Sequence, residues 1–374
     1  MTYLVESIKR RYPDANLSVL QSYLQTADVK VVAFIELVAQ MDMDLPQWDN
    51  NSLDMTQVQA LQLVARTACC MNEHKYNCID WYNKLKDPKR PAGMSEVEFG
   101  RQLMLSCKLD PDEMMDLSLE KLKLIFNYFS QCMVIGIENL TGQIHVARHS
   151  STTQLSGTNV PLAQVNFISG YMQPSDPIKV DFANKNIGGG VMSYGCCQEE
   201  IMFLANPELM GLMSLVDTLG PYEALAISGV TQYSKVNHYG FDLRFGGTMY
   251  VPNQTIIVLD AIDYRKRISD QYLSVNKYTE LQKAINGFMG VGSGQCISTG
   301  NWGCGAFAGD HRIKFMIQWI AASITQNSFN YYVDQPHIAS KLKAIYNQLE
   351  SKNIDRLLHE LMEVQTSTHV PISN

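Results

Sequence analysis

The feature that most restricts the fold is a change in the spacing of apolar residues near position 135. Before it, apolar residues recur at helical spacing, as they do from Leu117 to Phe129. From about residue 143, short β-rich runs alternate with helical ones, and these runs cover residues 144–147, 178–182, 224–227, 255–262 and 330–333. Such alternation favours a sheet with helices on both faces. We therefore predict an α/β chain, with a mixed sheet flanked by helices and an N-terminal all-helical lobe.

The length of the chain supports a division into two parts. Domains cluster at roughly 100–200 residues, and this chain has 374. We expect a helical accessory region over residues 1–135 and a larger α/β domain over residues 136–374. Within the latter, Asn206 and Pro207 predict a helix start, Gly220 predicts its end, and residues 338–364 have the pattern of amphipathic helix.

Charge and composition limit the classes of partner. The net charge of −7 argues against a broad electrostatic grip on nucleic acid, so any nucleotide-like ligand must be held locally. No apolar run is long enough to span a membrane. Lys9, Arg10 and Arg11 lie where a signal peptide would need its apolar stretch. Nine cysteines without a secretion signal indicate reduced thiols. We expect an intracellular protein, with no direct contact to nucleic acid or membrane.

A run of three glycines, Gly188 to Gly190, follows the predicted strand at residues 178–182. Glycine permits positive φ and lets a ligand approach bare backbone N–H groups, which is how loops cradle a diphosphate. A structural turn is the other interpretation of the same run, and the glycines alone do not separate the two.

Two acidic residues stand seven residues beyond the glycines. Glu199 and Glu200 precede an apolar run that starts at Ile201, so they lie at a predicted helix start. Acids there are often only favourable partners of the helix dipole. Cleavage of a glycosidic bond, however, needs a carboxylic acid to protonate the leaving oxygen, and a glycine loop nearby would hold the phosphates of a substrate.

The combination of Gly-Gly-Gly, seven residues and Gln-Glu-Glu resembles the signature of poly(ADP-ribose) glycohydrolases. Other segments resemble this family in the same order, namely residues 180–184 (VDFAN), 198–209 (QEEIMFLANPEL), 232–234 (QYS) and 299–310 (TGNWGCGAFAGD). Residues 121–129 (KLKLIFNYF) resemble its helical accessory region. The resemblance extends over roughly residues 115 to 365.

The resemblance implies a macrodomain-like sheet and an enzyme that releases ADP-ribose by hydrolysing the 1″–2′ ribose–ribose bonds of poly(ADP-ribose). It implies that Glu200 is the general acid and base, acting through an oxocarbenium-like transition state. Glu199 and Asn184 match residues that hold the scissile ribose, and Asp181 matches one that supports the pocket.

The binding residues are also implied by the resemblance. Tyr239 matches a tyrosine that stacks on adenine, Asn301 belongs to a second phosphate loop, and Phe307 matches a phenylalanine that orders the ribose. The implied substrate-binding set is Asn184, Gly188, Gly189, Gly190, Gln198, Tyr239, Asn301, Gly305, Ala306 and Phe307. No cofactor and no metal is implied. The implied partner is poly(ADP-ribose) on modified proteins. We expect a monomer in the nucleus or cytoplasm. Its activity would reverse ADP-ribosylation, including the ADP-ribosylation of the DNA damage response.

Two positions depart from the family pattern on the adenine side. An ungapped count places Asp334 where the family often has a second aromatic, just after Tyr331 and Tyr332. It places Tyr171 where an acid often reads the adenine edge. We therefore expect a rearranged adenine contact.

Three other interpretations concern patterns of cysteines, histidines and glycines. Cys70, His74 and Cys78 share one helix face, which could bind zinc or be a buried face. Cys304 and His311 flank the second glycine segment and could form a thiol nucleophile without an evident orienting residue. Glycines at 290, 292 and 294 would suggest a dehydrogenase, but they precede a predicted strand rather than a helix.

A macrodomain that binds ADP-ribose without cutting it is the alternative function. A pure reader needs no proton donor, so the presence of Glu199 and Glu200 argues against it.

Overall fold

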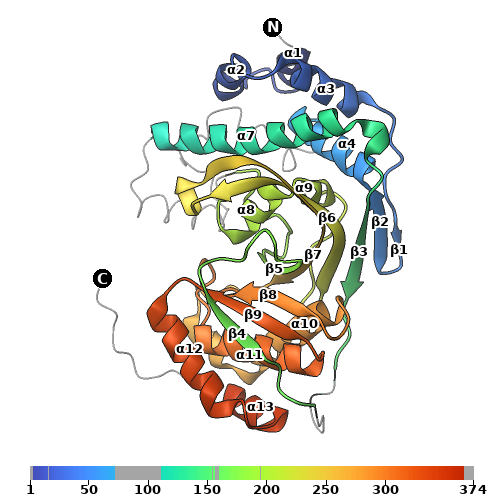
Figure 1. Cartoon of the computed structure of the whole chain (residues 1–374). Helices are drawn as coiled ribbons and strands as arrows, with labels where there is room; N and C mark the ends of the chain where they lie inside the picture. The colour runs from blue at the N-terminus through green and yellow to red at the C-terminus, as the bar shows by residue number, and fades with distance from the viewer. Residues whose placement is uncertain are drawn as a thin grey trace. The chain divides into compact units, whose positions relative to one another are not determined.

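The computed structural model describes residues 3–15, 17–71, 111–153, 155, 160–193 and 195–365 (Figure 1). The chain forms two compact units. Unit 1 comprises Met1–His145, Asn186–Asp217 and Gly229–Gln254. Unit 2 comprises Val146–Lys185, Thr218–Ser228 and Thr255–Asn374.

The first helices of the chain lie in unit 1. They are α1 (Tyr3–Arg11), α2 (Ser18–Leu24), α3 (Val29–Gln40), α4 (Gln57–Ala68), α7 (Pro111–Ile135) and the 3-10 helix η2 (Ile137–Asn139). The lobe is not all-helical as predicted, because β1 (Trp48–Asp49) and β2 (Ser52–Thr56) form an antiparallel pair. In β2, Leu53 and Met55 are buried while Asp54 between them is exposed, the period of two that a strand requires.

Local sequence explains where α4 begins. The Thr56 side chain accepts from the N–H of Gln59, and the Gln59 side chain accepts from the N–H of Thr56. This reciprocal capping box satisfies two of the donors that a helix start leaves unpaired.

The later elements of unit 1 carry several of the predicted site residues. They are α8 (Gln198–Ala205), α9 (Glu208–Leu212), η3 (Gly240–Asp242), and parts of β3 (Gln143–His149), β6 (Ala224–Asn237) and β7 (Arg244–Asp260). Helix α7 runs beside β6 and β7 in Figure 1, and its Asn127 side chain donates to the carbonyl of Tyr233 at 2.9 Å. The rings of Tyr128 and Tyr233 pack edge to face at 4.7 Å.

A buried acid joins three elements of unit 1. Glu208 is fully buried and accepts from the Tyr233 hydroxyl at 2.8 Å, the N–H of Thr231 at 2.8 Å and the Gln57 amide at 3.1 Å. Burial nevertheless raises the pKa of Glu208 to about 7. Stability of this unit should therefore depend on pH near neutrality.

Unit 2 is built on parallel strands. Its elements are β4 (Val165–Ser169), β5 (Ile178–Ala183), η4 (Ile268–Tyr272), α10 (Ser274–Met289), β8 (Cys296–Gly300), α11 (His311–Ile324), β9 (Ser328–Val333), α12 (Pro336–Leu349) and α13 (Ile354–Glu363). Strand β5 pairs in parallel with the end of β7 and with β8, β8 pairs with β9, and β9 pairs with β4. The described strands follow the order β1-β2-β3-β6-β7-β5-β8-β9-β4, so the sheet is mixed, as predicted.

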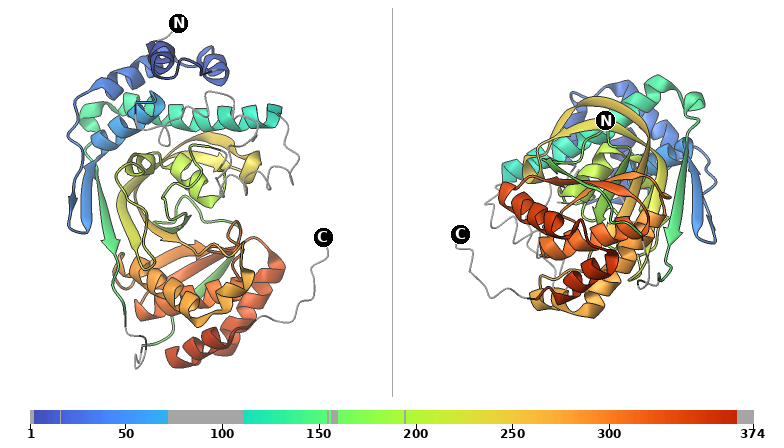
Figure 2. Two further views of the ribbon diagram at one scale, coloured as in Figure 1. Left: turned by 180° about the vertical axis from the view of Figure 1, so that it is seen from behind. Right: turned by 60° about the horizontal axis from the view of Figure 1, so that its bottom comes forward.

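Helices α10 and α11 of unit 2 pack against each other, as Figure 2 also shows. Their apolar faces join a core with Phe315, Trp319 and Tyr331, and the ring centroids of Phe315 and Tyr331 lie 5.3 Å apart. The predicted helical pattern over residues 338–364 is confirmed as two helices, α12 and α13.

Candidate active site

The first glycine loop, defined here as Gly188 to Gly190, is held against the two glutamates within unit 1. The N–H of Gly188 donates to Oε1 of Glu199 at 2.6 Å, and the N–H of Gly190 donates to Oε1 of Glu200 at 2.9 Å. The N–H of Gly189 donates to the carbonyl of Asn186 at 3.2 Å. The three N–H groups thus have protein acceptors, and two of those acceptors are the predicted catalytic carboxylates.

Glycine is required in this loop because the carboxylates leave no room for a side chain. A Cβ on Gly189 would lie 2.5 Å from Oε2 of Glu199 and 2.6 Å from Oε1 of Glu200. Gly188 and Gly189 also have φ of 85° and 49°, in the region that favours glycine. The loop is therefore shaped around the two acids.

Glu200 is held from its other oxygen by the start of α8. Cys197 is the N-cap, and its N–H donates to Oε2 of Glu200 at 2.9 Å, which makes Glu200 the acid of a capping box. Each carboxylate oxygen thus accepts one N–H and keeps a further acceptor position. Glu199 and Glu200 are both buried, so water competes little for these bonds. The arrangement fixes the plane of the Glu200 carboxylate.

Tyr239 lies at the same helix start. Its hydroxyl interacts with the Cys197 thiol and the backbone of Gln198. Burial raises the pKa of the Tyr239 hydroxyl, and the nearby Cys197 and Glu200 raise it further. The side chain as a whole is 45% exposed, so the phenolic end is covered while part of the residue remains accessible. The N–H of Gly240, the residue after Tyr239, donates to the carbonyl of Cys196 at 3.1 Å.

Unit 2 contains the remaining predicted residues. Asp181 is fully buried in β5, in register with Val258 of β7, and Asn184 directly follows the end of β5. Asn301 directly follows β8, and its side-chain oxygen accepts from the Tyr331 hydroxyl at 3.1 Å. Ligands of parallel sheets commonly bind beyond the carboxyl ends of the strands, and both asparagines lie at such ends.

The second glycine loop, defined here as Gly303 to Gly309, differs from the first in its backbone donors. The N–H of Gly309 donates to the carbonyl of Gly303 at 2.9 Å, and the backbone N–H of Tyr264 donates to the carbonyl of Phe307 at 3.0 Å. At the tip of the loop, the N–H groups of Gly305, Ala306 and Phe307 have no acceptor among the residues that the structure describes. These donors can serve an anion.

A buried ion pair under this loop was not predicted from the sequence. Lys314 pairs with Glu280, and its ammonium lies 4.3 Å from the ring centroid of Trp302. A Cβ on Gly303 would meet that ammonium at 3.2 Å. In the sequence, the two charges look like ordinary polar positions of helices, and only the fold shows that they are buried.

The adenine-side departures lie together in unit 2. The Tyr171 hydroxyl donates to Oδ2 of Asp334 at 3.3 Å. Tyr331 is fully buried, and the Tyr332 hydroxyl donates to Asp176 at 3.2 Å, so both behave as strand residues, as predicted.

The competing chemistries gain no support from the described residues. Burial raises the pKa of the Cys304 thiol, which disfavours the nucleophilic thiolate. Residues 290–294 connect the end of α10 to β8, which is the wrong order for a dinucleotide loop. His74 and Cys78 of the possible zinc site lie outside the described residues. No group of three or more potential metal ligands occurs in the part of the chain that the structure describes.

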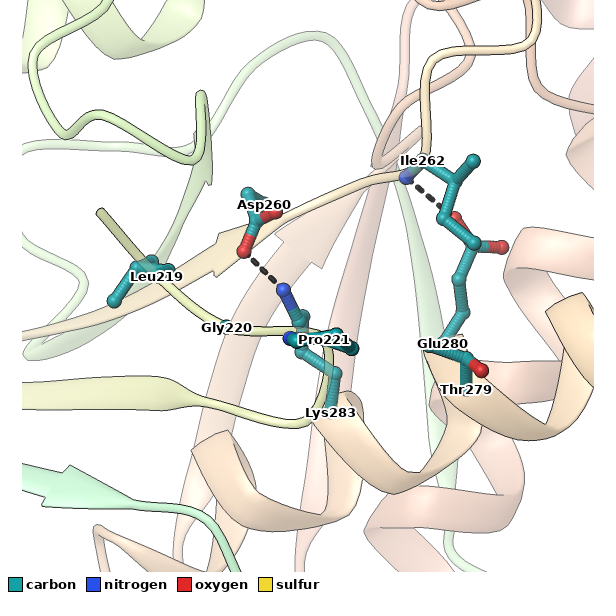
Figure 3. A pocket seen from close by; sticks show the side chains of 8 residues that line it. All are labelled: Leu219, Gly220, Pro221, Asp260, Ile262, Thr279, Glu280 and Lys283. Carbon is teal, nitrogen blue, oxygen red and sulfur yellow. Dashed lines mark hydrogen bonds and ion pairs between the residues drawn. The ribbon is translucent and has the colours of Figure 1, made fainter.

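A pocket of about 310 Å³ lies at the carboxyl end of β7 in unit 2 (Figure 3). Its lining includes Asp260 and Lys283, which form an ion pair with each other, and Glu280, which accepts from the N–H of Ile262 at 2.9 Å. None of the predicted site residues lines it, and its charges are already paired, so we assign it no chemistry. Among the described helices, none has the length and apolar character needed to cross a membrane.

Several known proteins are similar to parts of this chain. Poly(ADP-ribose) glycohydrolase 1 of Caenorhabditis elegans is 34% identical over 201 residues, covering 47% of this chain and 26% of that protein. Poly(ADP-ribose) glycohydrolase 1 of Arabidopsis thaliana is 27% identical over 296 residues, covering 57% of this chain and 54% of that protein. The chain thus spans between about a quarter and about half of the length of these relatives.

A solved structure is also similar to part of this chain, with a low TM-score. The poly(ADP-ribose) glycohydrolase of Deinococcus radiodurans in complex with ADP-ribose has a TM-score of 0.37 and 15% identity, over 50% of this chain and 86% of that one. A family model described as poly (ADP-ribose) glycohydrolase, macro domain fold, matches residues 149–339. Because this match covers more than half of the sequence, the chain belongs to the poly(ADP-ribose) glycohydrolase family.

Proposed function

We propose that this chain hydrolyses the 1″–2′ ribose–ribose bonds of poly(ADP-ribose) and releases ADP-ribose. The observation that carries the proposal is the pair of buried acids, Glu199 and Glu200, each accepting an N–H from the first glycine loop. A binding module needs no proton donor, whereas a glycosidase requires a carboxylic acid beside the scissile bond.

In the proposed reaction, Glu200 gives a proton to the ribose 2′ oxygen as its bond to C1″ breaks. The carboxylate that remains then takes a proton from water as the water oxygen bonds to C1″. The carboxylate of Glu199 beside it would stabilise the positive charge that develops on the ribose. Glu200 returns to its protonated form, so the cycle is balanced.

We propose binding roles for the other predicted residues. Donors at the tip of the second glycine loop, Gly305 to Phe307, would hold the diphosphate. Asn184 and Gln198 would hold the ribose, and Asn301 would take part with the second glycine loop in holding the phosphates. Asp181 would support the pocket from within β5. Tyr239 would offer its accessible ring to adenine.

We also propose a division of labour along the sequence. Residues 1–135 would be an accessory region and residues 136–374 would contain the catalytic macrodomain. The protein would act as a monomer inside the cell, in the nucleus or cytoplasm, on poly(ADP-ribose) attached to proteins. It would need no metal or cofactor.

The test is to incubate the whole chain with purified poly(ADP-ribose) and quantify ADP-ribose by chromatography over time. The Glu200→Gln variant is the matched control, because it keeps the size of the side chain and removes its acid. Release of ADP-ribose by the wild-type chain but not by Glu200→Gln supports the proposal. A chain that binds ADP-ribose but releases none from the polymer would be a reader, and the proposal would be wrong.

A further inference from the structure

Lys121 of α7 is buried and makes three hydrogen bonds to one short segment. Its ammonium donates to the carbonyls of Val191 at 3.0 Å, Ser193 at 2.7 Å and Gly195 at 2.7 Å. An ammonium has three donors, so these carbonyls use all of them. The side chain is fully buried, which makes the position of its charge costly to disturb.

The segment that Lys121 holds lies directly on Glu200. A Cβ on Gly195 would lie 2.6 Å from Cδ and Cγ of Glu200, so the Glu200 side chain fills the space that a side chain at position 195 would need. The N–H of Gly195 donates to the carbonyl of Gly190 at 2.9 Å, and the N–H of Gly190 donates to Glu200. Only one residue therefore separates Lys121 from the carboxylate.

The neighbouring residue of α7 supports the other side of unit 1. Glu120 accepts from the N–H of Phe245 at 2.7 Å, at the start of β7. Asn127, two turns further along α7, donates to the Ser234 hydroxyl of β6 at 2.8 Å. Since α7 is thus anchored on both strands, Lys121 reaches the carbonyls of Val191, Ser193 and Gly195 from a fixed helix.

We propose that Lys121 is a positioning residue for catalysis, which sets the orientation of the Glu200 carboxylate through Gly195 and Gly190. The inference rests on the proposed function of Glu200. It assigns to α7 a role in turnover rather than in substrate affinity, since Lys121 contacts the segment beneath the acid.

The first experiment compares Lys121→Met with Lys277→Met. Lys277 is also fully buried, and its ammonium donates to the carbonyls of Met362 at 2.9 Å and Val364 at 2.7 Å, so it is a matched buried lysine outside the proposed site. Both variants should melt at lower temperature than the wild type. Only Lys121→Met should lose kcat, by about tenfold to a hundredfold, because small displacements of a catalytic group are costly. Its KM and its affinity for ADP-ribose should change by less than about threefold.

A double-mutant cycle separates positioning from a general loss of structure. In a Glu200→Gln background, Lys121→Met should reduce the residual kcat no further, because the group that it positions is gone. A folded Lys121→Met variant with wild-type kcat would overturn the proposal, as would additive losses in the cycle. A wild-type chain without any activity would instead count against the proposed function.

If Lys121→Met does not fold, Lys121→Arg takes its place in the same comparison, with Lys277→Arg as the control. Arginine keeps the charge but spreads its donors over a planar fork, so it cannot serve three carbonyls from one atom. We expect kcat to fall at least about threefold in Lys121→Arg and to stay unchanged in Lys277→Arg. Wild-type kcat in folded Lys121→Arg would also overturn the proposal.

Discussion

The two glycine loops have similar compositions but use their backbone donors differently. In the first, the N–H groups of Gly188 and Gly190 are taken by Glu199 and Glu200. In the second, the N–H groups from Gly305 to Phe307 have no acceptor among the described residues. A glycine-rich loop can therefore orient an acid or receive an anion, and the distinction depends on whether the fold supplies an acceptor.

From this difference we expect substitutions in the first loop to lower turnover and substitutions in the second to lower affinity. The difference also revises the initial interpretation of Gly189 and Gly190, in which their N–H groups faced the diphosphate. In the structure, Gly189 donates to Asn186 and Gly190 to Glu200. Substitutions in the two loops should consequently separate kcat from Kd.

The largest effect is expected for Glu200→Gln. The amide cannot donate a proton as an acid, and general acid–base catalysis contributes about 10²–10⁴-fold, so turnover should fall at least about a hundredfold. Affinity for ADP-ribose, measured by calorimetric titration, should remain within a few-fold of the wild type. Near-normal turnover would remove Glu200 from the mechanism.

Gly189→Ala should come next, with a loss of turnover of about tenfold or more. The added Cβ would lie against Oε2 of Glu199 and Oε1 of Glu200, so both carboxylates must move. Steady-state kinetics on the polymer would show the loss in kcat, and circular dichroism would confirm the fold. If only the affinity for ADP-ribose changed, the first loop would be a phosphate loop after all.

Gly305→Val tests the other side of the comparison. A Cβ there meets no atom within 4 Å, so the variant should fold normally. A branched side chain at the loop tip would nevertheless obstruct an approaching diphosphate. We expect affinity for ADP-ribose to fall about tenfold, or about 1.4 kcal/mol, with a smaller change in kcat. Unchanged affinity would exclude this loop tip as the anion site.

Tyr239 links binding to the first glycine loop and should show both kinds of effect. Stacking on a base contributes about 1–3 kcal/mol, so Tyr239→Ala should weaken ADP-ribose binding about tenfold. Tyr239→Phe keeps the ring and loses the hydroxyl that interacts with Cys197 and Gln198. Its affinity should match the wild type, whereas its kcat should fall a few-fold. Equal, wild-type affinities for both variants would contradict the stacking role.

The smallest effect concerns Glu208, a buried acid of unit 1 to which we assign no catalytic role. Its pKa is raised from 4.5 to about 7, so the folded state binds this proton more tightly than the unfolded chain does. The corresponding stability is full below about pH 4.5 and is lost as the pH rises through about 7. We expect a loss of about 1–3 kcal/mol between pH 5 and 8, seen as a fall in Tm of several degrees.

Glu208→Gln is the control for that pH dependence. Because the amide does not titrate, Tm of this variant should vary less between pH 5 and 8 than that of the wild type. An equal pH dependence in both proteins would show that another group is responsible.

Much of the fold follows from local patterns in the sequence. The β-rich runs became β3, β5, β6, β7 and β9, and α8 begins at Gln198, where the acids marked a helix start. The predicted helix start at Asn206 and Pro207 is one residue early, because α9 begins at Glu208 with Pro207 as its N-cap. Asn206 is instead the C-cap of α8, where its side chain donates to the carbonyl of Met202 at 2.8 Å. The predicted end at Gly220 is wrong, since α9 ends at Leu212. The pair Asn-Pro fits the end of one helix as well as the start of another.

The candidate site was less accessible to sequence reasoning. The order of glycines and acids predicts candidate residues, but it does not show which acceptor each N–H finds. Gly188 meets an acid eleven positions away, and Lys121 meets carbonyls seventy or more positions away. The contacts of Lys121 depend on the packing of α7, which no local pattern encodes.

The three bonds of Lys121 have a consequence for how this chain could be shortened or recombined. The match to the family begins at residue 149, yet a chain cut there would lack the lysine that holds the segment beside Glu200. A relative's N-terminal helices could replace those of this chain only if they present an ammonium at the same place. We therefore expect the first 135 residues and residues 188–200 to change together among related proteins.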